Sequence, residues 1–186
     1  MIKYLFSIIF FINLTTVATY AANVVMEDNI VIDTLPNDFS QLNFKTVGKA
    51  KFSVLFWDIY NSTLYTQTGR YLHDNSSESL LFEIEYLKDI TAEDLLERTA
   101  QQWEHLNVPE LVYSKYLPAL KTIWPDISSG DKLTLFVQNQ QSVFYFNHEK
   151  VGVIEEADFS KLFLDIWLSP NTSQTQLRKE LLGEVK

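Results

Sequence analysis

Cysteine is absent from the 186 residues of the sequence, and glycine is sparse, with five residues in all. A chain without cysteine forms no disulfide and cannot carry a lipid on an N-terminal cysteine. The glycines stand at positions 48, 69, 130, 152 and 183, too far apart to build a loop that cradles phosphate. These two shortages exclude a disulfide scaffold, a cysteine-anchored lipoprotein and a glycine-rich nucleotide loop.

Histidine and clustered basic residues are also scarce. His73, His105 and His148 stand in different predicted elements and have no ligand spacing around them, so we expect no metal site and no cofactor. The chain contains no GxSxG motif of a serine hydrolase. The net charge is −9 and no cluster of Lys and Arg interrupts it, so nucleic acid is not an expected partner.

Apolar residues, in contrast, are plentiful. Hydrophobic residues make up 46% of the chain and aromatic residues 14%, enough for one well-filled core and too many for a disordered protein. We expect a single domain over residues 22–186, present as a monomer.

The first 21 residues have the pattern of a secretory signal peptide. Lys3 supplies a positive start, residues 4–17 form an apolar run, and residues 19–21 form a small-x-small cleavage site. The run is interrupted by polar residues and is shorter than the roughly 20 apolar residues that span a bilayer. We therefore expect no stable membrane anchor and a mature chain that begins near Ala22, in the periplasm or outside the cell.

The stretch 47–65, VGKAKFSVLFWDIYNSTLY, is the most apolar part of the mature chain. Read with a period of two residues, both of its faces are apolar in the middle, which predicts a central strand covered on both sides, with Trp57 buried. Asp58 and Tyr60 bring polar groups to the end of this strand. Either neighbouring groups satisfy them, or they face a ligand cleft.

The remaining pattern predicts an α+β domain. Strands are expected over 24–33, 43–47, 80–87, 132–137, 142–147 and 151–154, and helices over 91–106, 109–125, 156–168 and 173–182. Thr91 and Asp94 resemble a capping box at the start of the first helix. Pro118 is expected to kink or split the second helix and to open a gap in the packing beside Tyr113 and Tyr116, which are either core residues or ligand contacts.

Three separated blocks of the sequence resemble the bacterial chalcone isomerase-like proteins. They are the central stretch quoted above, the segment WPDISSGDKLTL at 124–135, and the segment FYFNHEKVGVIEEADFSKLFLDIWLSPNTSQTQLRKELLG at 144–183. The resemblance implies an antiparallel sheet with helices on one side, a smaller set of strands on the other, and a cleft between sheet and helices.

The same resemblance implies candidate site residues. Plant chalcone isomerases use an arginine before the central strand and a threonine hydroxyl on it, whereas other members of the fold bind fatty acids without turnover. Tyr60 stands at the threonine position, where fatty-acid-binding members tend to have tyrosine. The arginine position falls near Ala50, between Lys49 and Lys51, and a lysine does not reproduce the planar fork of an arginine.

Three functions stay open on the sequence. The first is an exported, non-catalytic binder of a small hydrophobic or fatty-acid-like ligand, with contacts from the candidate residues Lys49, Lys51, Asp58, Tyr60, Tyr113 and Tyr116. The second is an isomerase or intramolecular lyase in which Tyr60 donates a proton or a hydrogen bond. The third is a structural or partner-binding protein whose cleft is filled by its own side chains.

Overall fold

The computed structural model of the protein describes residues 39, 42–72 and 78–185. Six antiparallel strands form one sheet in the order of the sequence. They are β1 (Lys45–Val54), β2 (Trp57–Thr66), β3 (Leu80–Tyr86), β4 (Lys132–Gln138), β5 (Gln141–Phe146) and β6 (Glu149–Ile154). Among the described residues, no helix is both long and apolar enough to cross a membrane.

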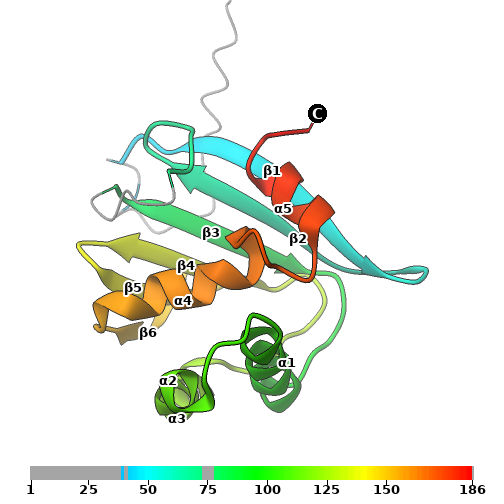
Figure 1. Ribbon diagram of the computed structural model, residues 1–186, viewed down its shortest axis with the longest axis vertical. Helices are drawn as coiled ribbons and strands as arrows, with labels where there is room; N and C mark the ends of the chain where they lie inside the picture. Colours follow the sequence, from blue (N-terminus) through cyan, green and yellow to red (C-terminus); the bar gives the residue numbers. More distant parts are fainter. Residues whose placement is uncertain (1–38, 40–41, 73–77, 186) are drawn as a thin grey trace, which may run out of the picture.

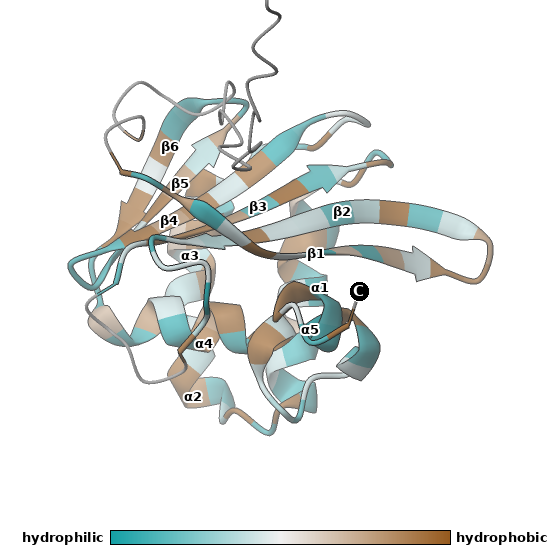
Figure 2. Cartoon of the chain, turned by 90° about the horizontal axis from the view of Figure 1, so that it is seen from above, coloured by the Kyte–Doolittle hydropathy of each residue, from teal (hydrophilic) through white to brown (hydrophobic). Residues whose placement is uncertain are grey.

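The helices cover one face of this sheet (Figures 1 and 2). They are α1 (Ala92–His105), α2 (Glu110–Tyr113), the 3-10 helix η2 (Ser114–Tyr116), α3 (Leu117–Ile123), α4 (Ala157–Leu168) and α5 (Thr175–Leu181). The prediction of an α+β fold with an antiparallel sheet and helices on one side is confirmed.

Local sequence signals account for the start of α1 and for the break before α3. The Thr91 hydroxyl accepts a hydrogen bond from the Asp94 backbone N–H, as the N-cap residue of a capping box does, and donates one to the Asp94 carboxylate. Pro118 stands in the first turn of α3, where its missing N–H is tolerated. The predicted second helix is therefore split into α2, η2 and α3, as the sequence indicated.

The main core lies between the sheet and the helices. On β3 the alternating residues Leu80, Phe82, Ile84 and Tyr86 are buried in it, while Glu83 on the opposite face pairs with Lys132 at 3.2 Å. This alternation is the one expected from the sequence, with the carboxylates on the wetter side.

A second, smaller cluster covers part of the opposite face of the sheet. Phe39, Tyr65, Leu81, Phe136 and Tyr145 form it, with Leu42, Phe44 and Val143 packed against them. Within the described ranges this face carries no second set of strands. The strand predicted over 24–33 and the signal peptide predicted over 1–21 lie outside the described residues.

The prediction of one central strand over 47–65 is wrong. Val54 pairs with Trp57, so the chain reverses at Leu55 and Phe56, and the stretch forms the β1–β2 hairpin at one edge of the sheet. The end of this hairpin projects past the helices (Figure 2). Trp57, predicted to be buried, is 61% exposed.

Candidate functional site

Tyr60 lies in the main core between the sheet and α4. Its hydroxyl accepts a hydrogen bond of 2.9 Å from the Trp167 indole N–H. Its ring stacks on Phe52 at 5.1 Å between centroids and meets the edge of Tyr86 at 6.0 Å. Burial raises the pKa of Tyr60 to about 12, and the hydrogen bond from Trp167 opposes this shift. The hydroxyl of Tyr60 thus already has a partner within the chain.

The predicted cationic residues lie on the other face of the sheet from Tyr60. Lys51 pairs with Asp58 at 2.8 Å, and the Ser53 hydroxyl donates to the same carboxylate at 2.7 Å. The hydrogen bonds from Lys51 and Ser53 hold the pKa of Asp58 below its usual value. Lys49 is exposed and, by strand alternation, lies on the same face as Lys51. The structure therefore does not bring Lys49, Lys51 and Asp58 together with Tyr60.

The position that the resemblance assigns to arginine is occupied by Ala50, which is buried in the main core. Its carbonyl oxygen accepts a hydrogen bond from the Ser62 hydroxyl at 3.2 Å. The rings that contact Tyr60, those of Phe52, Tyr86 and Trp167, carry no charge. These residues therefore provide no positive charge that could stabilise an anion formed beside Tyr60 during a reaction.

Tyr113 ties α2 to α1. It is buried, its hydroxyl donates to the Glu104 carboxylate at 3.0 Å, and its ring stacks on Trp103 at 5.5 Å. Burial, followed by the neighbouring Glu104, raises the pKa of Tyr113. This tyrosine, like Tyr60, is satisfied by groups of its own chain.

Tyr116 differs from both of these tyrosines. It is 3% exposed and its ring packs edge-on against Phe159 at 4.9 Å, but its hydroxyl has no hydrogen-bond partner within the described part of the chain. A buried hydroxyl left unpaired costs about 1–3 kcal/mol. A buried polar group of this kind calls for an explanation.

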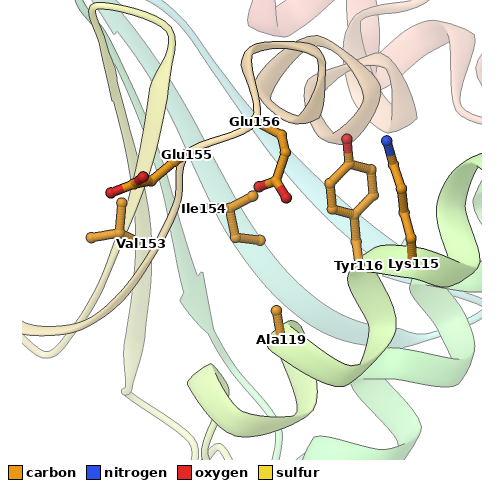
Figure 3. A pocket seen from close by; sticks show the side chains of 7 residues that line it. All are labelled: Lys115, Tyr116, Ala119, Val153, Ile154, Glu155 and Glu156. Carbon is orange, nitrogen blue, oxygen red and sulfur yellow. The ribbon is translucent and has the colours of Figure 1, made fainter.

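Tyr116 lines a hollow of about 550 Å³ on the surface (Figure 3). One wall comes from η2 and α3, the other from the end of β6 and the segment that leads into α4. The lining residues are Lys115, Tyr116, Ala119, Val153, Ile154, Glu155 and Glu156. The hollow lies beside Pro118, where the sequence predicted a gap in the packing.

The charges of the hollow are divided between its two walls. The Lys115 ammonium group lies 4.7 Å from the centre of the Tyr116 ring, and both side chains rise together from the same helical segment (Figure 3). Glu155 and Glu156 stand on the facing wall. The cationic side chain of Lys115 and the Tyr116 side chain thus share one wall of the hollow.

A second buried donor without a partner belongs to the same end of the core. The Trp124 indole N–H has no hydrogen-bond partner within the described ranges, and its ring is 3% exposed. Trp124 contacts Phe144 and Phe163, and both of these rings contact Phe159, against which Tyr116 packs. One aromatic cluster therefore joins the two unpaired donors.

Sequence reasoning found Tyr116 but missed the rest of the hollow. The available signal was the helix-breaking effect of Pro118, because Lys115 precedes this residue and Ala119 and Trp124 follow it. Val153, Ile154, Glu155 and Glu156 gave no signal, because their meeting with α3 depends on the packing of β6. Among the described residues, no group of three or more His, Cys, Asp or Glu side chains is placed to hold a metal ion.

Three comparisons with known proteins agree with this fold. The family model described as chalcone isomerase-like matches residues 18–183. An uncharacterised protein of Haemophilus influenzae is 24% identical over 144 residues, which cover 77% of this chain and 70% of that protein. The crystal structure of a fatty-acid binding protein of Arabidopsis thaliana superposes with a TM-score of 0.58 at 10% identity, covering 81% of this chain and 90% of that one. This chain belongs to the chalcone isomerase-like family.

Proposed function

We propose that the protein is a non-catalytic binder of a small, largely apolar ligand that ends in a hydrogen-bond-accepting oxygen, as a fatty acid does. The observation that carries this proposal is the buried, unpaired hydroxyl of Tyr116, a residue that lines the hollow. A carboxylate or carbonyl oxygen would accept a hydrogen bond from it and offset the cost of its burial.

The shape and chemistry of the hollow support such a ligand. Its volume of about 550 Å³ lies within the range of small-molecule sites. Ala119, Val153 and Ile154 supply apolar surface. Lys115 supplies a cation beside the Tyr116 ring, so an anionic head group is best placed on this wall and away from the two glutamates.

The structural neighbour supports the same class of ligand. The protein from Arabidopsis thaliana is a fatty-acid binding protein, and at 10% identity the likeness shows a shared fold. The state of Tyr60 supports binding without turnover. Its hydroxyl is hydrogen-bonded to Trp167, and a pKa of about 12 makes it a poor proton donor or acceptor near neutral pH.

A pair of matched variants tests the site. We expect Tyr116→Phe to weaken the binding of a long-chain fatty acid, measured by calorimetric titration, at least several-fold while leaving the stability of the protein unchanged or slightly raised. Tyr113→Phe is the control, because its hydroxyl serves Glu104. It should cost roughly 0.5–1.5 kcal/mol of stability and leave binding intact.

The ligand can be identified by mass spectrometry of the small molecules that are extracted from protein purified from its host. Recovery of a fatty acid or similar amphiphile at near-stoichiometric amounts is the expected result. An empty protein that does not bind fatty acids, or a Tyr116→Phe variant that binds as tightly as the parent, would contradict the proposal. Saturable turnover of a hydroxychalcone above the spontaneous rate would favour the isomerase alternative instead.

We also propose that the mature protein is exported. The support is the pattern of residues 1–21, a positive start, an apolar run and a small-x-small site. N-terminal sequencing of protein from the host should find a first residue within a few positions of Ala22. Intact Met1 in the membrane fraction would mean that the N-terminal segment is retained as an anchor.

A further inference from the structure

The end of the β1–β2 hairpin carries the largest exposed apolar side chains of the sheet. We call residues 54–57 the hairpin tip: Val54 is 47% exposed, Leu55 87%, Phe56 96% and Trp57 61%. Single exposed apolar residues are ordinary on protein surfaces, but four in succession at a projecting end are not. Figure 2 shows the apolar colouring of this end, which projects past the helices.

The backbone at the hairpin tip is also unfavourable for its sequence. Leu55 has a φ of 56°, in the left-handed region that bulky residues rarely adopt. Hairpins with loops of this length prefer glycine, asparagine or aspartate at such positions. Leu55 therefore combines a strained conformation with an apolar side chain that nothing in the described chain covers. A strained backbone conformation that is not compensated by packing within the molecule is typical of functional sites.

The charges around the hairpin tip balance locally. Lys51 is paired with Asp58, and the Lys88 ammonium group lies 4.6 Å from the centre of the Trp57 ring. Asp89, next to Lys88, accepts a hydrogen bond from the Ser129 backbone N–H. The tip thus has no excess of negative charge, although the whole chain carries −9. A strongly anionic surface would repel the whole molecule, whereas a zwitterionic one would not.

We propose that the hairpin tip inserts into the interface of a zwitterionic lipid bilayer. A narrow, convex end suits a deformable lipid surface, because a protein partner would need a matching groove. In this arrangement Leu55 and Phe56 enter the boundary of the acyl chains, and Trp57 lies at the level of the head groups, where tryptophan is favoured. Lys88, over the Trp57 ring, then reaches the lipid phosphates while its stem stays on apolar surface.

This inference does not depend on the proposed ligand site. The hairpin tip belongs to β1 and β2, whereas the hollow is lined by β6 at the other edge of the sheet. Substitutions in one therefore leave the other unchanged, and the two proposals fail or succeed separately.

Trp57 provides a local reporter. The chain has four tryptophans; Trp103 and Trp124 are buried, and Trp167 is partly buried with its N–H bonded to Tyr60. Mixing the full chain with phosphatidylcholine vesicles should shift the emission of Trp57 to shorter wavelength and protect it from acrylamide. Because Trp57 is 61% exposed in the free protein, both changes should be large. Attachment through residues 4–17 alone would not produce them.

Variants that replace exposed apolar residues by aspartate, at the hairpin tip or away from it, decide the matter. L55D combined with F56D should lower the partition into vesicles at least roughly tenfold, because two charged groups replace the inserted side chains. L111D is the control, since Leu111 on α2 is 88% exposed and lies away from the hairpin. It should bind vesicles as the parent does. Circular dichroism should show that both variants are folded.

Three results would overturn the proposal. Trp57 emission that does not change with vesicles is the first, and equal vesicle binding by the parent and the L55D/F56D variant is the second. The third is self-association that depends on the hairpin tip, seen in sedimentation without any vesicle binding, which would assign the tip to a second copy of the chain.

Discussion

At the scale of single residues, the partner of each buried hydroxyl distinguishes tyrosines that look alike in the sequence. Tyr60 bonds to Trp167 and Tyr113 bonds to Glu104, whereas Tyr116 has no partner within the described chain. The cost of a buried polar group depends on whether it is paired, far more than on its type. This difference moves the candidate ligand contact from Tyr60 to Tyr116.

Tyr60→Phe should therefore act on stability. The substitution keeps the ring that stacks on Phe52 and removes the acceptor of the Trp167 N–H, leaving a partly buried donor unpaired. We expect a loss of about 1–3 kcal/mol in the free energy of unfolding, measured by urea denaturation, and no change in fatty-acid binding. Weaker binding with unchanged stability would show that Tyr60, and not Tyr116, contacts the ligand.

Two tryptophans offer a second comparison at this scale. Trp57 is 61% exposed on the hairpin tip, and Trp103 is fully buried with its N–H bonded to the Leu162 carbonyl oxygen. Trp57→Ala should change the free energy of unfolding by no more than about 0.5–1 kcal/mol, because it leaves no cavity. Trp103→Ala should cost roughly 3–5 kcal/mol. A large loss for Trp57→Ala in the same denaturation series would mean that the tip is covered in the free protein.

At the scale of elements, the sequence predicted structure well wherever a local signal exists. The capping residues of α1 and the break at Pro118 follow from chemistry within a few residues. The hairpin over β1 and β2 lacked such a signal, since Leu55 and Phe56 are not turn formers and the flanking residues are apolar. An apolar run predicts a buried strand because apolar residues are usually buried. Here four of them are left in solvent.

The packing of α5 on β1 depends on Gly48. A Cβ at this position would collide with the backbone carbonyl oxygens of Glu180 and Leu181, which cannot move without displacing α5. Gly48→Ala should therefore lower the free energy of unfolding by about 1–3 kcal/mol or more. The neighbouring Lys49→Ala is a suitable control, since its side chain is exposed. Equal thermal melting of the two variants would show that α5 is not fixed against β1.

At the scale of the whole molecule, the candidate site arises from the meeting of distant segments. The sequence pointed to Tyr113 and Tyr116 because both lie just before the break at Pro118, but it also grouped Lys49, Lys51, Asp58 and Tyr60. Strand alternation places Lys49 and Lys51 on the face of the sheet opposite Ala50 and the core. A register shift between Phe52 and Ser53 turns Asp58 to the Lys51 side, away from Tyr60. The hollow needs β6 to approach α3, where Gly152 lies against the Ile123 side chain, and no local pattern specifies that contact.

Buried tyrosines also set the response of the whole molecule to alkali. Burial raises the pKa of both Tyr60 and Tyr65 to about 12, and that of Tyr86 further still. Below pH 10 these groups are protonated in both the folded and the unfolded chain, so their contribution to stability is complete. Above pH 10 the unfolded chain releases protons that the folded chain retains, which favours unfolding. Stability should therefore fall between about pH 10 and 12.

The measurement is ultraviolet absorbance of tyrosinate together with far-ultraviolet circular dichroism across this pH range. Tyr60, Tyr65 and Tyr86 should ionise only as the circular dichroism is lost, above the usual tyrosine pKa of about 10. Tyr60→Phe should show a smaller drop in the free energy of unfolding between pH 8 and pH 11 than the parent, because one of the linked groups has been removed. If all nine tyrosines ionise near pH 10 while the circular dichroism stays unchanged, the hydroxyls of Tyr60, Tyr65 and Tyr86 are open to solvent and the two apolar clusters do not bury them as described.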